Sequence, residues 1–255
     1  MRFRIFEELE MIKETQRISL PEFDLGGVVP WGRRLAEYQA FFALDDMDGG
    51  GPVLDAGGGP VLDAGGGPSS FAAEVASAGV RVVAVDPIYR FPGEAIAARF
   101  EQTAVAMREG MARAADRFNW GHYGSEEAVH RLRREALALF LADFEAGKAV
   151  GRYVPAVLPN LPFADGVFRL ALSSHLLFLY GDTLDFDFHV AAMKELLRVA
   201  GEVRVFPLFN LDGRPSSHLP GVMRAMGQDG VRCALREVPF EFQKGARQML
   251  VAWRG

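Results

Sequence analysis

Apolar residues along most of the chain fall into two alternating patterns. Residues 61–63, 80–86 and 168–173 are short and mainly apolar runs, which is typical of strands buried on both faces of a sheet. Residues 69–78, with Ser69 or Ser70 as N-cap, and residues 188–199 are predicted helices. Strands that alternate with helices predict an α/β fold with a doubly wound, mostly parallel sheet.

The C-terminal part of the chain predicts the remaining strands. Residues 203–208 form an apolar run, and a predicted helix follows at residues 217–226. The last two apolar runs, residues 231–238 and 248–253, are separated by a lysine–glycine turn with no room for a helix. We therefore expect them to pair as an antiparallel hairpin at the edge of a seven-stranded sheet.

Two further segments are predicted to be helical. Within residues 1–48, a run beginning at Leu35 places apolar side chains on one helical face. Residues 93–150 are long for a simple crossover, and Ser125 before two glutamates is a typical start signal for a helix. We interpret residues 1–255 as a single domain, with residues 1–48 as an N-terminal helical cover and residues 93–150 as a helical insertion.

A tandem repeat precedes the first predicted core strand. The eight residues 51–58 are repeated without change at residues 59–66. Only one copy can form the strand, and the second is followed directly by the predicted helix. The first copy also lies too far from the next strand for one turn, one helix and one strand. We therefore assign residues 61–67 to the strand and its turn, and residues 53–59 to an added surface loop.

Composition narrows the class of protein. The net charge of −5 disfavours nucleic acid as a partner, because surfaces that bind nucleic acid are usually basic. The densest basic cluster, residues 131–134, is expected on the solvated face of a helix. A single cysteine excludes an internal disulfide, and the histidines show no spacing typical of metal ligands. With no membrane-length apolar run and no secretory signal, we expect a cytoplasmic protein with a small-molecule substrate.

The candidate chemistry begins with a glycine turn between a strand and a helix. The strand at residues 61–63 ends in Asp63, and three glycines follow at residues 65–67. Glycines let the backbone approach a ligand closely and adopt positive φ. Asp86 ends the next strand about 20 residues later, the spacing at which an acid binds the ribose hydroxyls of a nucleotide.

Two cofactor classes share this layout. A dinucleotide site requires a third glycine where this chain has Ser70, and its helix N-terminus faces a pyrophosphate. The carboxylate of Asp63 would repel a pyrophosphate but attract the ammonium group of a methionine moiety. The residues therefore favour S-adenosylmethionine over NAD.

These motifs resemble those of a known superfamily. Residues 61–70, followed by the strand that ends in Asp86, are similar to the first two motifs of class I S-adenosylmethionine-dependent methyltransferases. Residues 161–175 resemble the fourth-strand motif of the same superfamily, and the loop at residues 67–71 resembles an uncharacterised bacterial subgroup of it. The resemblance covers residues 50–255 and implies a Rossmann-like methyltransferase fold.

The resemblance also implies roles for single residues. Asp63 would orient the amino group of the methionine moiety, Asp86 would bind the ribose, and Ile88 would pack on the adenine. Ser173 or Ser174 would lie under the sulfonium. The implied cofactor-binding positions are Asp63, Gly65, Gly66, Gly67, Ser69, Asp86, Pro87, Ile88, Leu161, Ser173 and Ser174.

Two positions depart from the pattern of the superfamily. Residues 157–160, the segment expected to form the third strand, lack the acid that often contacts the adenine amino group. Arg169 stands where the superfamily usually has aspartate. The first departure affects adenine recognition, and the second affects only surface charge.

Candidate residues for the acceptor side come from the helical segments and from the end of the fourth strand. Arg33 or Tyr38, in the N-terminal cover, is expected to meet the cofactor carboxylate. Trp31, Trp120 and Tyr180 are candidate substrate contacts. His175 follows the fourth strand, where open α/β sheets place ligands, and is a candidate general base; alternatively it positions the cofactor or caps the strand.

The sequence therefore predicts an enzyme that transfers a methyl group from S-adenosylmethionine to a small-molecule acceptor. Transfer is an in-line displacement that needs alignment and a dry site. Two alternatives remain open at this point. One is a non-catalytic member of the fold that binds the cofactor or a partner, and the other is an NAD-dependent oxidoreductase.

Overall fold

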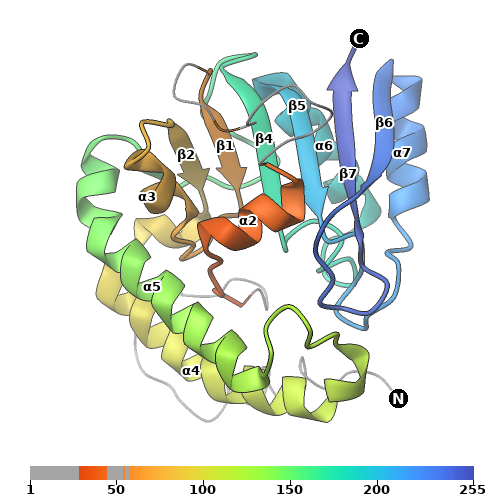
Figure 1. Ribbon diagram of the computed structural model, residues 1–255. Helices are drawn as coiled ribbons and strands as arrows, with labels where there is room; N and C mark the ends of the chain where they lie inside the picture. The colour runs from red at the N-terminus through yellow and green to blue at the C-terminus, as the bar shows by residue number, and fades with distance from the viewer. Residues whose placement is uncertain (1–28, 45–53, 55–57) are drawn as a thin grey trace.

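The computed structural model describes residues 29–44, 54 and 58–255, and its strands form one twisted sheet (Figure 1). The strand order is β3-β2-β1-β4-β5-β7-β6. The strands are β1 Val61–Ala64, β2 Val82–Val85, β3 Tyr153–Val154, β4 Phe168–Ser174, β5 Ala200–Phe206, β6 Val231–Glu237 and β7 Gln248–Arg254.

Strand direction identifies the fold. β1 is parallel to β2 and β4, while β2 pairs with β3 and β4 with β5 in the same sense. β7 runs antiparallel to both β5 and β6, so the predicted C-terminal hairpin at the sheet edge is confirmed. A seven-stranded sheet of this order, with β7 reversed, is the Rossmann-like methyltransferase fold, and the predicted fold class is confirmed.

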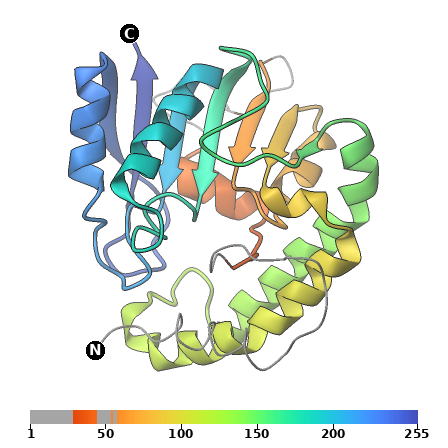
Figure 2. The ribbon, with the colours of Figure 1, turned by 180° about the vertical axis from the view of Figure 1, so that it is seen from behind.

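Helices cover both faces of the sheet (Figures 1 and 2). α2 (Leu35–Phe42) and α3 (Phe71–Ala76) lie on one face, and α6 (Phe186–Val199) and α7 (Leu219–Gln228) lie on the other. Each face packs its own apolar core against the central strands. All four residues of β1 are buried, as expected of a strand between two helical layers.

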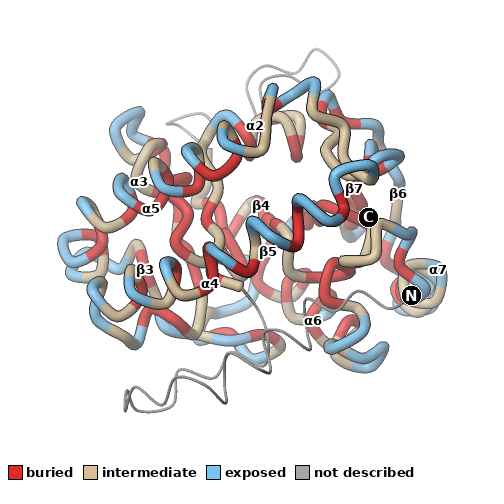
Figure 3. Tube along the Cα trace, turned by 90° about the horizontal axis from the view of Figure 1, so that it is seen from below, coloured by how far each residue is buried: buried red, intermediate tan, exposed pale blue. Residues whose placement is uncertain are grey.

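The segment predicted to be an insertion forms a pair of long helices that passes beyond the carboxyl ends of the parallel strands (Figure 1). α4 spans Gly93–Arg113 and α5 spans Glu126–Ala149, with short 3-10 turns at Pro87–Arg90 and Ala115–Arg117. The Ser125 hydroxyl accepts a hydrogen bond from the backbone N–H of Ala128, which confirms the predicted N-cap. Buried and exposed residues alternate along α4 (Figure 3), and α4 packs against α5.

The duplicated segment is resolved in favour of its second copy, as predicted. β1 begins at Val61, in the second copy, and ends at Ala64. Most of the first copy, like residues 1–28, lies outside the described residues, so the predicted loop at residues 53–59 and most of the predicted N-terminal helices are not described.

Two strand predictions need correction. The third strand is Tyr153–Val154 and not residues 157–160, which form a loop closed by a bridge between Val157 and Asn160. β5 begins at Ala200, directly after α6, and ends at Phe206 rather than continuing to residue 208. It stops there because Pro207 has no backbone N–H to offer the sheet.

Candidate functional site

A cavity of about 440 Å³ opens at the carboxyl ends of β1, β2 and β4. This volume is within the range of small-molecule sites. The glycine turn, the residues after β2 and the residues after β4 form its base, and the segment before α2 forms part of its cover. Of the predicted site residues, it is lined by Trp31, Arg33, Tyr38, Gly65, Gly66, Gly67, Asp86, Pro87, Ile88, Ser174, His175 and Tyr180.

The glycine turn needs its glycines for specific steric reasons. Gly65 and Gly67 both have positive φ, at 76° and 54°. A Cβ on Gly65 would come within 2.5 Å of the Leu176 side chain, and a Cβ on Gly66 would come within 2.6 Å of an Asp63 carboxylate oxygen. A Cβ on Gly67 would meet nothing within 4 Å. Gly65 and Gly66 are therefore closely packed against neighbouring side chains, whereas the space next to the Cα of Gly67 is free.

Asp86 joins the end of β2 to this turn. One of its carboxylate oxygens accepts a hydrogen bond from the Gly67 N–H at 2.9 Å, and the other accepts one from the Ile88 N–H at 3.0 Å. Burial raises the pKa of Asp86 to about 6, against the opposing effect of these two hydrogen bonds. Each oxygen keeps a further lone pair, so the carboxylate can still accept hydrogen bonds from a ligand at the cavity.

Asp63 lies behind the glycine turn and does not line the cavity. Its two oxygens each lie 3.0 Å from the hydroxyl of Tyr38, which donates to them, and its side chain is almost completely buried. Burial raises its pKa to about 7; the Tyr38 hydrogen bond opposes this and the charge of Asp86 adds to it. Tyr38 and the turn therefore stand between Asp63 and the cavity.

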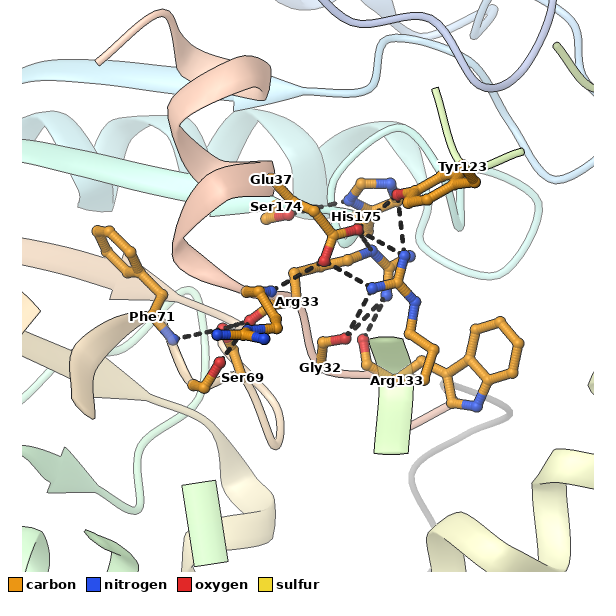
Figure 4. Close-up of polar contacts among 12 residues, drawn as sticks. Gly32, Arg33, Glu37, Ser69, Phe71, Tyr123, Arg133, Ser174 and His175 are labelled. Carbon is orange, nitrogen blue, oxygen red and sulfur yellow. Dashed lines mark hydrogen bonds and ion pairs between the residues drawn. The ribbon is translucent and has the colours of Figure 1, made fainter. Parts of the chain in front are cut away.

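A buried charged network anchors the cover of the cavity (Figure 4). Arg133 donates two hydrogen bonds to the Glu37 carboxylate, at 2.6 and 2.7 Å, and Tyr123 donates a third. Burial alone would raise the pKa of Glu37, but the charge and hydrogen bonds of Arg133 lower it to about 2. Arg133 also donates to the Gly32 carbonyl, so the network ties α5 to the segment before α2. The expectation of a solvated face for residues 131–134 is thus wrong at Arg133, which is 2% exposed.

Arg33 lies beside this network, on the wall of the cavity. Its Nη1 donates to the Trp31 carbonyl at 2.6 Å, while its Nε is 4.0 Å from a Glu37 oxygen. That Nε is buried and has no hydrogen-bond partner among the described residues. Burial, and then the charge of Arg133, lower the pKa of Arg33 to about 10, so the guanidinium is still charged at neutral pH.

His175 ends the fourth strand on the same wall. Its φ of 56° is left-handed, a conformation in which histidine is enriched among non-glycine residues. Its Nδ1 lies 2.9 Å from the Ser174 hydroxyl, and its ring packs on Phe41. Burial lowers the pKa of His175 well below 6.5, and the charges of Arg33 and Arg133 lower it further. The imidazole is therefore neutral at physiological pH.

Besides Asp63, four predicted site residues lie outside the cavity lining. The Ser69 hydroxyl donates to the Arg33 carbonyl at 2.7 Å, so Ser69 holds the cover in place. Leu161 and Ser173 are buried in the sheet region. Trp120, in the connection between α4 and α5, packs its ring on Phe242.

The lining also contains apolar residues that the sequence analysis missed. Met107 comes from α4, Val157 and Leu158 come from the loop after β3, and Leu176 and Leu179 follow β4. Apolar residues at such places look like ordinary core positions in a sequence. The one available signal was the position of Leu176 and Leu179 just beyond a strand end.

A second cavity of about 120 Å³ adjoins the first. The two cavities share a wall made of Trp31, Arg33, Met107, His175, Leu179 and Leu211. The rest of the second cavity is formed by the end of α4, the connection to α5, the end of β5 and the turn between β6 and β7.

The structure describes residues 29–44, 54 and 58–255. These contain no group of three or more His, Cys, Asp or Glu residues that could hold a metal ion. No helix within them is both long and apolar enough to cross a membrane.

No family model matches the chain. It is 28% identical, over 234 residues, to the uncharacterized protein MJ0045 of Methanocaldococcus jannaschii. The aligned region covers 91% of this chain and 98% of that protein.

Similar solved structures are remote in sequence. The chain is similar to magnesium protoporphyrin IX methyltransferase from Synechocystis PCC 6803 with bound SAM, at 14% identity and a TM-score of 0.45, over 98% of this chain and 91% of the other. It is also similar to a SAM-dependent methyltransferase from Aquifex aeolicus, at 12% identity and a TM-score of 0.39, over 78% and 82% of the two chains. The strand order, rather than these similarities, identifies the fold.

Proposed function

We propose that this protein binds S-adenosylmethionine in the larger cavity and transfers its methyl group to a small-molecule acceptor. The observation that carries the proposal is the position of Asp86 at the base of the cavity. Its carboxylate accepts a hydrogen bond from the Gly67 N–H in the glycine turn. A diol that reaches this carboxylate finds a charged acceptor whose position is already fixed by two backbone N–H groups.

The remaining walls suit the other parts of the cofactor. Ile88, Val157 and Leu158 present apolar side chains, which favour a flat purine ring over a charged group. The bare face of Gly67 leaves room for the methionine chain. S-adenosylmethionine, when bound, supplies an electrophilic methyl group on a sulfonium. The protein supplies alignment and exclusion of water, through the cover that Glu37 and Arg133 anchor.

The structure also weighs against the dinucleotide alternative. A pyrophosphate in that class of site lies in front of the helix N-terminus that follows the glycine turn. Here the Ser70 N–H donates to the Arg33 carbonyl, and a Cβ on Gly32 would come within 2.0 Å of the Pro68 carbonyl oxygen. The segment before α2 thus occupies the space that a pyrophosphate requires.

A competition experiment tests the proposal. Radiolabelled S-adenosylmethionine is equilibrated with the protein by dialysis, and unlabelled S-adenosylhomocysteine or NAD is added in excess. We expect the protein to retain the label, S-adenosylhomocysteine to displace it, and NAD to leave it in place. Displacement by NAD, or no retention of the label at all, would contradict the proposed cofactor.

A further inference from the structure

We infer that the second cavity receives the methyl acceptor, and that this acceptor presents a single aromatic ring carrying a carboxylate, which is ionised at neutral pH. The inference rests on the proposed function, because it takes the larger cavity as the cofactor site. It adds the chemical class of the substrate and the residues that select it.

Position is the first argument. The two cavities meet at a wall that includes Arg33 and His175, and this wall adjoins the ends of β4 and β5. A group in the second cavity therefore lies beside the first cavity, next to Arg33 and His175. In-line transfer between two bound molecules requires such an arrangement.

Size is the second argument. An apolar cavity of about 150 Å³ accommodates one benzene molecule, and the second cavity measures about 120 Å³. Its floor is fixed by the backbone, because the Asn119 N–H donates to the Phe242 carbonyl at 2.7 Å and the Lys244 N–H donates to the Arg117 carbonyl at 3.0 Å. The connection between α4 and α5 is thus tied to the turn between β6 and β7, and the volume of this cavity suits a small guest such as one aromatic ring.

Wall chemistry is the third argument. Five aromatic residues line this cavity, and two of them, Phe118 and Phe242, stack at a centroid distance of 4.5 Å. Such rings favour a flat aromatic guest, by stacking or by edge-to-face contact. The aromatic lining residues are Trp31, Phe118, Phe206, Phe240 and Phe242.

Charge is the fourth argument and selects the polar group. Among the described residues, the titratable groups that line the second cavity are Arg33 and His175, and no carboxylate does so. Glu37 does not neutralise Arg33 fully, because both of its oxygens are engaged by Arg133. An ammonium group on the acceptor would therefore lack a counter-charge, whereas an anionic oxygen would have one.

The guanidinium of Arg33 favours an anionic oxygen over a neutral one, because a charged acceptor forms the stronger hydrogen bond with it.

The reaction balances without an added base. The acceptor oxygen forms the new bond to the methyl carbon as the bond from that carbon to sulfur breaks, and the bonding electron pair stays on sulfur. An anion and a cation become two neutral groups, which a site of low dielectric constant favours. Because the acceptor arrives ionised, the neutral His175 has no proton to remove and serves as part of the wall.

The test uses three probes of nearly equal shape and different charge: benzoate, benzamide and benzylamine. Each is titrated calorimetrically into the protein saturated with S-adenosylhomocysteine. We expect benzoate to bind at least about tenfold more tightly than benzamide, and benzylamine to show no binding. The preference for benzoate over benzamide should disappear in Arg33→Met.

Variants of the second cavity locate the probe. Ala246 is buried and lines this cavity but not the larger one, so Ala246→Leu should weaken benzoate binding and leave S-adenosylhomocysteine binding unchanged. Phe242→Ala should weaken benzoate by removing an aromatic wall, while Phe163→Ala, a partly buried phenylalanine outside both cavities, should not.

Three outcomes overturn the inference and are distinguishable. If S-adenosylhomocysteine binds but benzoate does not, or binds no better than benzylamine, the acceptor class is wrong while the cofactor assignment stands. Benzoate binding that is unaffected by both Ala246→Leu and Phe242→Ala would place the acceptor elsewhere. If S-adenosylhomocysteine itself fails to bind, the proposed function falls and the inference falls with it.

Discussion

The carboxylate of Asp86 accepts a hydrogen bond from the backbone N–H of Gly67 at 2.9 Å. This contact joins the end of β2 to the turn after β1, two places that are adjacent in the sheet but far apart in the chain. It fixes the acid before any ligand arrives, so little conformational entropy needs to be lost on binding at this position. The proposed cofactor site is therefore preorganised by the fold.

Asp63 should make the protein less stable as pH rises. Its pKa is about 7 in the folded state and is near 3.8 in the unfolded chain, so the folded state holds one more proton between these values. The free energy of unfolding then falls as pH increases through this window, by about 2 to 3 kcal/mol between pH 5 and pH 8. Urea unfolding at both pH values should show that Asp63→Asn lacks this part of the decrease.

The interpretation of Asp63 has an internal control. Asp86, with a pKa raised to about 6, contributes a decrease of the same sign, and it is present in both proteins. The difference between wild type and Asp63→Asn isolates the carboxyl of Asp63. Equal pH dependence in the two proteins would show that this group is ionised in the folded state throughout.

The ion pair between Glu37 and Arg133 should be costly to break from one side. Both side chains are buried, and Arg133→Met leaves the Glu37 carboxylate without its main partner. We expect Arg133→Met to lower the free energy of unfolding by about 3 to 5 kcal/mol. On the same helix, Arg134 pairs with Glu101 at the surface, and Arg134→Met should cost less than about 1 kcal/mol.

A double-mutant cycle completes that test. Glu37→Gln combined with Arg133→Met should cost clearly less than the sum of the two single changes, because no uncompensated charge stays buried. Additive costs would mean that the two side chains do not interact in solution.

His175 should stay neutral throughout the physiological range. Burial lowers its pKa well below 6.5, and the charge of Arg33 adds to this effect. In an NMR titration, the His175 ring signals should show no protonation step at 6.5 or above. Arg33→Met should move the step to higher pH, whereas Arg134→Met should not, since Arg134 is exposed on α5. A wild-type midpoint at or above 6.5 would restore His175 as a candidate general base.

The two copies of the repeat should respond differently to the same substitution. Leu62 in the second copy is fully buried within β1, while Leu54, its counterpart in the first copy, is only partly buried. Leu62→Ala should lower the free energy of unfolding by about 2 to 5 kcal/mol, and Leu54→Ala by less than about 1 kcal/mol. Thermal or urea unfolding measures both. A larger cost at Leu54 would show that the first copy forms the strand.

Local signals explain what the sequence could predict. The turn at residues 65–67, the acid Asp86 and the terminal hairpin each depend on a few neighbouring residues of restricted conformational preference. The third strand was misplaced because Tyr153–Val154 is two residues long and shows no periodicity. The loop that follows it, residues 157–160, contains a similarly apolar run.

Tertiary packing explains what the sequence could not predict. Glu37 lies 96 residues from Arg133 and 86 from Tyr123 along the chain, and neither distance leaves a pattern in the sequence. Arg133 stands between residues that are exposed or half-buried, so its burial is set by the cover and not by its own helix. The second cavity likewise forms only where α4, the β6–β7 turn and the end of β5 converge.

The central claim is that Asp86 holds the ribose of S-adenosylmethionine, and calorimetric titration with S-adenosylhomocysteine tests it most directly. Three proteins are compared: wild type, Asp86→Asn, and Asp187→Asn, a matched control with an exposed acid on α6. We predict a dissociation constant on the order of micromolar for wild type and the control, and a loss of about 10- to 100-fold in Asp86→Asn, the value of a hydrogen bond to a charged group. Undetectable binding by wild type, or equal affinity in Asp86→Asn, would contradict the account.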